Sequence, residues 1–548
     1  MRAAPRVKLS ALLSPLCALI LRVRQSGFSP RFIYLRIGTR PFARVLFSHC
    51  SLCLGTISPA ASVDLETQFN WKIVDKSVFG AERIALREPG LRAVARNIFD
   101  QTLADCSIER AFMQKVKASS GADASARLLF GAHLIDFSAI KHIRVIAAGK
   151  AAKSMLDALL ARLPGSTLDD VAGVLIAPDA DALPPGFELF RGGHPFPNEA
   201  SFAGARAALA MLNNLPPDAS AANTLCVFLI SGGASAMMEL PLDPSITLDE
   251  TIAFHRALVH SGASIMEINC VRKHFSAVKG GRFALAAKAA TCLTILLSDV
   301  PPGSPETIGS GPTLPDTSTI PECRQILKRY RLLEQFPASI RRFFTSDEMP
   351  ETAKPGELTA LTWTMLSADD LAESARIKAE SLGFVTVIDN SCDDWNYREA
   401  AEYLLQRIRE LRRSHKRVCL ISAGEIIVRP KESENHGIAI VSGNGGRNQH
   451  FALYAVTLLE EADAPISILS AGSDGIDGHS DAAGAVVDSQ TLRDGADNFG
   501  QATDLRASAE KALREFHSST FLEKVGATIV TGPTGNNLRD LRILLADG

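Results

Sequence analysis

The chain contains the stretch Val441-Ser-Gly443-Asn-Gly445-Gly446-Arg447-Asn-Gln-His450, and the mostly apolar residues 451–459 follow it directly. Glycines let the backbone approach a ligand closely, and the start of a helix attracts anions. Arg447 therefore stands just after a glycine turn, at the start of a predicted helix, where a guanidinium binds phosphate or carboxylate through two hydrogen bonds. The stretch predicts a loop and helix that bind an anion.

A second glycine-rich stretch, Ser470-Ala-Gly-Ser-Asp474-Gly-Ile-Asp477-Gly, follows an apolar strand predicted at residues 466–469. Aspartates on such a loop hold Mg²⁺ or accept a proton. Together with Arg447, these carboxylates predict chemistry on a phosphorylated or acidic small molecule.

Length and composition place the chain among multidomain globular proteins. Its 548 residues exceed one typical core, so two or more domains are expected, and 46% hydrophobic with 22% charged residues is ordinary for a soluble protein. Beyond residue 63 the chain carries 49 basic and 60 acidic residues, a net charge of −11. This acidic body argues against nucleic acid as a partner. No later apolar stretch of about 18 residues predicts a membrane-spanning helix.

The N-terminal region differs in charge from the rest. Residues 1–63 carry eight arginines, one lysine and no acidic residue, a net charge of +9. Arg-rich, Ser-containing and acid-free composition is typical of a mitochondrial presequence. The apolar residues 9–21 also fit a secretory signal, but arginines continue well past them; an untargeted, cytoplasmic protein is the remaining alternative.

The ten cysteines are scattered along the chain. The one close pair is Cys50 and Cys53, and no further spacing of cysteine and histidine typical of zinc sites follows it. We therefore expect reduced, mostly buried thiols.

From about residue 91 onward, short apolar runs alternate with helical patterns, which indicates an α/β fold. A linker is predicted at residues 345–358, and Thr247-Leu-Asp-Glu250 fits a capping box that opens a helix. Helices are predicted at residues 368–382, 397–413 and 447–459. Strands are predicted at residues 143–147, 171–176, 224–230, 292–297, 361–366, 385–388, 418–421, 438–441, 466–469 and 529–530.

Polar loops follow several of these strands, and ligands of open α/β sheets bind beyond the carboxyl ends of the strands. Gly149-Lys150 follows the first strand, and Lys150 either bridges a transferring phosphoryl group or is a solvated lysine at a helix start. The sequence there is not a Walker A motif. Asp299 follows the strand at 292–297 and is well placed for metal binding or proton transfer.

The loop Ser231-Gly232-Gly233-Ala-Ser235 would form a nest of N–H donors for an anion, or else a plain turn. A third segment, residues 269–282, concentrates cationic side chains beside a double glycine, and we expect it to bind an anion rather than to be only a solvated basic face. The candidate residues of this segment are Arg272, Lys279 and Gly280. Thr534 and Asn536 follow what is predicted to be the last strand, and they either contact a nucleotide or form a turn.

These motifs resemble the class II glycerate kinases, the glycerate 2-kinase family whose C-terminal half is called the MOFRL domain. The matching segments are residues 147–152, 230–236, 269–282, 297–313, 443–450, 470–484 and 528–537. They cover nearly everything from about residue 91 to the C-terminus. The family usually has Gly-Thr-Asn in the last motif, where this chain has Gly535-Asn536-Asn537.

The resemblance implies two α/β domains, a Rossmann-like one at 80–345 and a MOFRL-type one at 359–548, with the active site in the cleft between them. It implies transfer of the γ-phosphate of ATP to the 2-hydroxyl of D-glycerate, with Mg²⁺, in serine and fructose catabolism. The family's catalytic lysine matches Lys150 and its essential arginine matches Arg447. Its carboxylates fall at Asp299 and Asp474, the candidate metal ligands, and Asp477 lies close enough to share the role of Asp474.

Two alternatives stay open from the sequence. A hydroxypyruvate or 2-hydroxy acid oxidoreductase should carry G-x-G-x-x-G after a strand, but the final position of the spacing begun by Gly443 and Gly445 is Asn448. A non-catalytic nucleotide or metabolite sensor would not need Lys150, Arg447 and Asp474. The oligomeric state also stays open, with a homodimer as one option.

Overall fold

The computed structural model describes residues 90–118, 127–165, 170–429, 443–463, 466–494 and 504–547. The predicted presequence, Cys50, Cys53 and the strand predicted at 438–441 lie outside these residues.

The first large sheet is parallel and has the order β6-β5-β4-β7-β8-β9. Its inner strands are nearly continuous apolar runs, as expected of parallel strands that are buried on both faces. All six carboxyl ends lie at the same edge of this sheet, so the loops that follow them meet there. The strands are β4 His142–Ala148, β5 Val171–Ala177, β6 Phe187–Arg191, β7 Thr224–Ile230, β8 Thr291–Leu297 and β9 Leu361–Leu366.

The second large sheet has the order β10-β11-β15-β12-β13-β14. Only β10 and β11 pair in parallel, and the C-terminal strand β15 lies antiparallel between β11 and β12. Because β15 is central, the chain's last residues join two strands that are distant in sequence. The strands are β10 Val385–Ile388, β11 Arg417–Ala423, β12 Ile466–Gly472, β13 Gly484–Asp488, β14 Thr528–Ile529 and β15 Asp540–Asp547.

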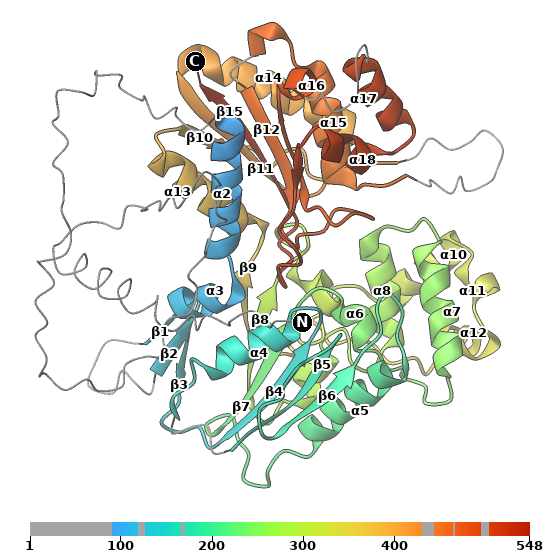
Figure 1. Ribbon diagram of the computed structural model, residues 1–548. Helices are drawn as coiled ribbons and strands as arrows, with labels where there is room; N and C mark the ends of the chain where they lie inside the picture. The colour runs from blue at the N-terminus through green and yellow to red at the C-terminus, as the bar shows by residue number, and fades with distance from the viewer. Residues whose placement is uncertain are drawn as a thin grey trace, which may run out of the picture. The chain divides into compact units, whose positions relative to one another are not determined.

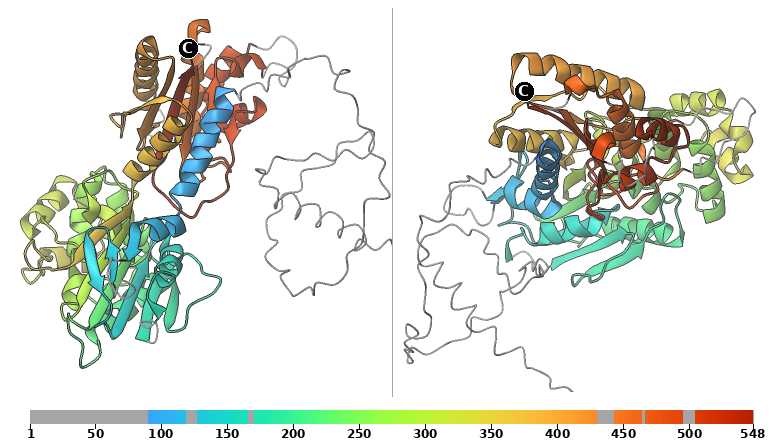
Figure 2. Two further views of the ribbon diagram at one scale, coloured as in Figure 1. Left: turned by 90° about the vertical axis from the view of Figure 1, so that its left-hand side faces the viewer. Right: turned by 45° about the horizontal axis from the view of Figure 1, so that its top comes forward.

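Helices cover both faces of each sheet (Figures 1 and 2). On β11, Cys419 and Ile421 join the core formed with α2 Leu91–Asp105 and α13 Ala368–Ser381. Val418 and Leu420 point the other way, to α14 Tyr397–Ser414 and α15 Arg447–Leu458. The core under α2 and α13 continues to α4 Ala152–Leu160 and one face of the first sheet, while α5 Glu199–Asn213 packs on the other face.

A separate helical core lies beside the first sheet's loops. Phe254 stacks on Phe275 and on Phe344, with ring centroids 4.1 and 5.9 Å apart. The capping box predicted at Thr247 and Glu250 is confirmed at the start of the first of these helices. The helices are α7 Leu248–Val259, α8 Ile265–Phe275, α10 Ile320–Arg329, α11 Leu332–Gln335 and α12 Ala338–Thr345.

The remaining elements are short. A three-stranded antiparallel sheet, β1-β2-β3, follows α2 and the next helix. These elements are α3 Ile108–Lys115, β1 Val116–Ala118, β2 Arg127–Phe130, β3 His133–Asp136, α6 Ala234–Met237, α9 Arg282–Ala286, η4 Pro305–Ser310, η5 Glu461–Asp463, α16 Thr491–Asp494, α17 Leu505–Arg514 and α18 Ser518–Lys524.

The predicted α/β class is confirmed, and three details differ from expectation. Strand β9 lies C-terminal to the predicted linker but pairs with β8 in the first sheet. Helix α2 belongs to the N-terminal part of the chain but packs on the second sheet. The last strand is β15, not residues 529–530, because Asp540 and Arg542 interrupt the apolar pattern of a strand that is nevertheless buried.

Within the described ranges, no helix is both long and apolar enough to cross a bilayer.

Candidate active site

Lys150 lies at the carboxyl end of β4, in a loop tied to the loop after β7. Its backbone N–H donates to the carbonyl of Gly232 at 2.9 Å, and the Ala151 N–H donates to Ser231 Oγ at 3.1 Å. Gly149 has φ +119°, and a Cβ there would lie 2.4 Å from Ser231 Oγ. The structure therefore fixes the backbone of Lys150, which is an exposed residue.

The predicted serine–glycine loop brings Asp299 beside Lys150. A Cβ at Gly232 would lie 1.9 Å from Asp299 Oδ2, so only glycine leaves room for this carboxylate. Gly233 has φ +86°, and a Cβ there would lie 3.3 Å from Lys150 Cγ. The loops after β4, β7 and β8 thus gather an amine, a carboxylate and a glycine turn at one place.

Ser235 points to a second layer of hydroxyls. Its Oγ lies 2.8 Å from Ser310 Oγ, and the Ser310 hydroxyl donates to Asn269 Oδ1 at 3.1 Å. This chain of hydrogen bonds connects the serine–glycine loop to α8.

The positive charge of Lys150 lowers the pKa of carboxyl groups on loops of both large sheets. Burial raises the pKa of Asp299, while its own backbone N–H and the positive charges of Lys150 and Arg539 offset part of that rise. Burial also raises the pKa of Asp474, with a further rise from Asp540 and partial offsets that include Lys150. The positive charge of Lys150 therefore reaches one carboxyl group on a loop of each sheet, Asp299 and Asp474.

Arg447 is the first residue of α15, and two carboxylates hold it. Its Nε and Nη2 donate to Asp540 at 2.6 and 3.1 Å, and its Nη1 donates to Glu425 Oε2 at 2.8 Å. These partners keep the pKa of the guanidinium high even though burial opposes it. About a third of the side chain, 36%, stays exposed, so one face remains open to a ligand.

The sequence did not indicate four charged residues at this site: Asp393, Glu425, Arg539 and Asp540. Arg539 has φ +70° and donates to both oxygens of Asp393 at 2.6 and 2.7 Å. A signal was present in the charges at 539, 540 and 542 next to an apolar run. If the apolar run had been predicted as a strand, these three charged residues would have been placed at the start of that strand.

Asp477 has a different role from the one expected. It is 2% exposed and accepts hydrogen bonds from the backbone N–H groups of Asn448 at 3.0 Å and Gln449 at 2.7 Å. A Cβ at Gly446 would lie 2.2 Å from its Oδ1. Burial raises the pKa of Asp477 to about 7 against these two donors. Asp477 thus caps α15 and positions Arg447, and it does not share the role of Asp474.

Lys279 and Gly280 are likewise structural in this arrangement. Lys279 is fully buried, and its Nζ lies 2.7 Å from Glu239 Oε2, which His255 also contacts at 2.8 Å. Gly280 forms a turn with φ +56° against Thr352. A ligand would have to break a buried ion pair to reach Lys279.

Arg272 differs from Lys279 because it is only partly buried and its Nε has no hydrogen-bond partner among the described residues. Burial lowers its pKa, and the nearby Glu239 partly offsets this. Arg272 lies on α8, three residues after Asn269, and stays a candidate for binding an anion.

Thr534 and Asn536 shape the loop that carries Asp474. The Thr534 N–H donates to the carbonyl of Asp474 at 3.0 Å, and its hydroxyl donates to the carbonyl of Ser473 at 2.7 Å. The Asn536 amide donates to the carbonyl of Cys106 at 2.7 Å, which ties the loop to the end of α2. Both residues line a cavity of about 490 Å³ beside α4.

A second cavity of about 710 Å³ opens around Arg447. Gly445, with φ +135°, contributes to its wall and packs against Ser518, where a Cβ would lie 2.4 Å from Oγ. The size suits a small-molecule ligand. Its polar and aromatic lining includes Asp394, Glu425, Arg447, Asn448, His450, Asp474, Asp477, His479, Phe516 and Ser518.

A lysine, two arginines and partly desolvated carboxylates lie on loops of the two large sheets. This set of residues is typical of an enzyme that acts on small anionic substrates.

Two family models match the chain: a domain of unknown function, DUF4147, at residues 94–345 and the MOFRL family at residues 418–540. D-glycerate 2-kinase of Thermotoga maritima is 35% identical over 65% of this chain and 79% of its own length. A relative from Agrobacterium vitis, provisionally named hydroxypyruvate reductase, is 33% identical over 73% of this chain and 86% of its own length.

The crystal structure of glycerate kinase from Thermotoga maritima superposes with a TM-score of 0.69 at 30% identity, covering 83% of this chain and 99% of that one. The chain therefore belongs to the glycerate kinase family with a MOFRL domain.

His450 makes the stability of this region sensitive to acid. Its ring stacks on Phe516 with centroids 5.1 Å apart, and its Nε2 has no partner among the described residues. Burial, with help from Arg398, lowers its pKa to about 4 from 6.5. The unfolded chain then binds a proton that the folded chain does not, so stability is lost as the pH falls from 6.5 to about 4.

We expect His450→Gln to remove this loss, about 3 kcal/mol at most by the size of the shift. Urea unfolding at pH 7.5, 6, 5 and 4.5 should show a smaller change for the variant than for the wild type. If the free energy of unfolding falls equally with pH in the two proteins, His450 is not neutral in the folded state.

Proposed function

We propose that this protein transfers the γ-phosphoryl group of ATP to the 2-hydroxyl of D-glycerate, giving 2-phospho-D-glycerate and ADP. The observation that carries the proposal is that the glycine turn after β7 packs against both Lys150 and Asp299, and that the charge of this lysine also reaches Asp474 of the second sheet. Phosphoryl transfer needs positioning and charge neutralisation more than covalent chemistry, and this site supplies both. Membership of the glycerate kinase family supports the same reaction.

The residues divide into three roles. Lys150 and the open face of Arg447 neutralise the negative charge of the transferring phosphoryl group. Asp299 accepts the proton of the 2-hydroxyl, because its raised pKa brings a carboxylate closer to the pH at which it works. The loop from Ser231 to Ser235 binds an anion, either a phosphate or the glycerate carboxylate.

Mg²⁺ fits the oxygen donors of this site. Asp474 is a partly desolvated carboxylate whose pKa is raised, so a cation beside it offsets an electrostatic cost, while Asp299 stays free to accept the proton of the substrate. One or two carboxylates plus substrate phosphates are the usual magnesium ligands. When bound, the ion supplies positive charge to the phosphate oxygens of ATP.

A coupled ADP-release assay with D-glycerate, L-glycerate and glycerol tests the proposal, followed by NMR of the product. We expect ADP release with D-glycerate and a phosphate on carbon 2. A parallel arm offers hydroxypyruvate with NADH or NADPH, because of the Agrobacterium relative's name. Reduction of hydroxypyruvate without ADP release from D-glycerate would contradict the proposal in favour of an oxidoreductase, and neither reaction would favour a sensor.

Asp299→Asn is expected to lower kcat by about 10²- to 10⁴-fold, the range of a lost general base. Its thermal stability at pH 8 should not fall, since a carboxylate with a raised pKa is destabilising once ionised. Asp179→Asn is the matched control, because Asp179 follows the neighbouring strand β5 but is exposed and paired with Arg191. If Asp299→Asn keeps full activity, the carboxylate of Asp299 has no role in the reaction.

We also propose that residues 1–63 direct the protein to mitochondria. The support for this proposal is that these residues carry a net charge of +9 and contain no acidic residue. A fluorescent reporter fused to residues 1–63 should colocalise with a mitochondrial marker, and a protein starting near Ser77 should keep its glycerate kinase activity. A cytosolic or secreted reporter would contradict the proposal.

A further inference from the structure

Three potential metal ligands meet between α8 and α10, away from Lys150 and Asp299. The Cys270 and Cys323 sulfurs and a ring nitrogen of His274 all lie within 4.8 Å of one another. Cys270 is 5% exposed, Cys323 is fully buried, and so is the His274 side chain. Among the described residues, this is the one group of at least three such side chains with that spacing.

Two of these ligands come from one helix. Cys270 and His274 are four residues apart on α8, so their side chains share one face. Cys323 comes from the first half of α10, which packs on α8 in the separate helical core that contains Phe254. Rigid helices on both sides hold the three ligand atoms in place, as metal sites require.

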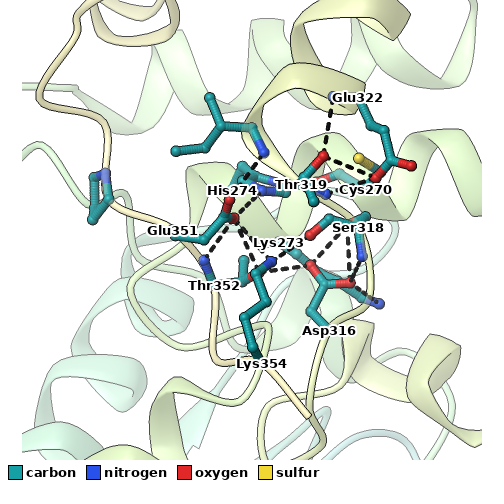
Figure 3. A network of polar contacts seen from close by, with 12 residues as sticks. Cys270, Lys273, His274, Asp316, Ser318, Thr319, Glu322, Glu351, Thr352 and Lys354 are labelled. Atoms are coloured by element: carbon teal, nitrogen blue, oxygen red, sulfur yellow. Dashed lines mark hydrogen bonds and ion pairs between the residues drawn. The ribbon is translucent and has the colours of Figure 1, made fainter. Parts of the chain in front are cut away.

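The second ring nitrogen of His274 has the partner that metal-binding histidines usually have. Its Nε2 lies 2.8 Å from Glu351 Oε1, within a network of polar contacts (Figure 3). Glu351 is itself held by the Lys354 ammonium at 3.0 Å and by the Ile320 N–H at 3.2 Å. A histidine that donates one N–H to a fixed carboxylate presents its other nitrogen to a metal.

The other ring nitrogen, Nδ1, lies 2.8 Å from the Cys270 carbonyl oxygen, one turn earlier on α8, which is a contact for a protonated nitrogen. A metal ion bound by the three ligands would replace that proton, and the ring would have to turn from the carbonyl oxygen towards the two sulfurs. Protons from His274 and from both thiols leave when the metal binds, as at other thiolate sites.

We propose that Cys270, His274 and Cys323 bind one zinc ion that fastens α8 to α10. Sulfur and imidazole ligands favour zinc over magnesium or calcium. Zinc bonds of about 2.3 Å to sulfur and about 2.0 Å to nitrogen need ligand atoms about 3.5–3.8 Å apart, so small inward movements suffice. Two thiolates cancel the charge of the ion, and a water or hydroxyl oxygen completes the four ligands.

The site has a structural consequence for the anion-binding loop. Asn269 precedes Cys270 on α8 and accepts the hydrogen bond of Ser310, which in turn contacts Ser235. Zinc therefore fixes the helix on which this chain of hydrogen bonds rests. A simple pair of thiols poised for a disulfide would not need His274 or its carboxylate partner.

Metal analysis of the full-length protein tests the inference. Protein purified with a thiol reductant and without chelator should contain about one zinc per chain by plasma mass spectrometry. Cys270→Ser and Cys323→Ser should lose it. Cys292→Ala is the matched control, because Cys292 is equally buried but lies in β8, and it should keep its zinc.

A second measurement begins with the wild-type chain, so that its main result does not depend on the folding of variants. Cobalt(II) added after removal of zinc should give a thiolate-to-cobalt charge-transfer band in the near ultraviolet. Glu351→Gln should weaken cobalt binding by about 10- to 100-fold, the usual effect of losing the carboxylate partner. Wild-type protein without zinc and without this band would overturn the inference. So would a Cys270–Cys323 disulfide found by mass spectrometry in zinc-free protein.

Discussion

Lys150→Ala is expected to lower kcat for D-glycerate phosphorylation by about 10²- to 10³-fold, the effect of removing one preorganised charged donor. The reason is that its positive charge reaches both Asp299 and Asp474 and lowers the pKa of each carboxyl group. The fold should not change, because Lys150 is exposed and its structural contact is made by its backbone N–H. ADP release and thermal unfolding measured on the same preparation separate the two effects.

Lys153→Ala is the matched control for this experiment. Lys153 lies one turn further on, in α4, and pairs with Asp157 at 2.6 Å. We expect its removal to leave kcat unchanged. Wild-type turnover in a well-folded Lys150→Ala protein would make Lys150 a solvated lysine at a helix start, which is the alternative that the sequence left open.

The first sheet was predictable because burial on both faces makes parallel strands into uninterrupted apolar runs. Residues 224–230 illustrate this, since all seven are buried in β7. The second sheet was harder, because β15 begins with Asp540 and carries Arg542 in its interior. Arg542 is fully buried and donates to the carbonyl of Gly424 at 3.1 Å. Partners outside β15, including this carbonyl just beyond β11 and the carboxylate of Asp393, help to accommodate the charge there.

The candidate site was predictable where a charged residue follows a strand or a glycine turn. Lys150, Asp299 and Asp474 follow strands, Arg447 follows a glycine turn, and the structure connects them electrostatically. The rule fails for Lys279, whose neighbouring glycines suggested an anion site while its partner Glu239 lies 40 residues away. Partners distant in sequence decide whether a charge faces a ligand or a buried counter-charge.

Asp477 shows the same limit over a shorter range. The sequence places it three residues after Asp474 on one loop, so a shared role seemed natural. The structure directs it instead to the N-terminus of α15, where two unpaired backbone N–H groups need an acceptor. Arg447 begins that same helix, so the cap of Asp477 sets the position of the arginine.

Arg447→Ala is expected to reduce both activity and stability, unlike Lys150→Ala. Arg447 neutralises Glu425 and Asp540, and the Asp540 side chain is only 3% exposed. Breaking a fully buried pair costs about 3–5 kcal/mol. Because Arg447 is about one-third exposed, we expect a smaller loss, about 2–3 kcal/mol, in urea unfolding at pH 7.5. kcat should fall by about 10²- to 10³-fold, as for other charged donors at a reacting phosphate.

A double variant separates the two effects of Arg447. Arg447→Ala with Asp540→Asn removes the carboxylate that the arginine leaves unpaired, so most of the lost stability should return. Turnover should not return, because the positive charge that Arg447 presents to the transferring phosphoryl group is still missing beside that of Lys150. Arg447→Lys should keep part of the stability but lose the two-pronged contact with Asp540, and its kcat should lie between those of the wild type and Arg447→Ala. If the double variant regains both stability and wild-type turnover, Arg447 only balances the charge of Asp540, and phosphoryl transfer at this site depends on Lys150 and Arg539 instead.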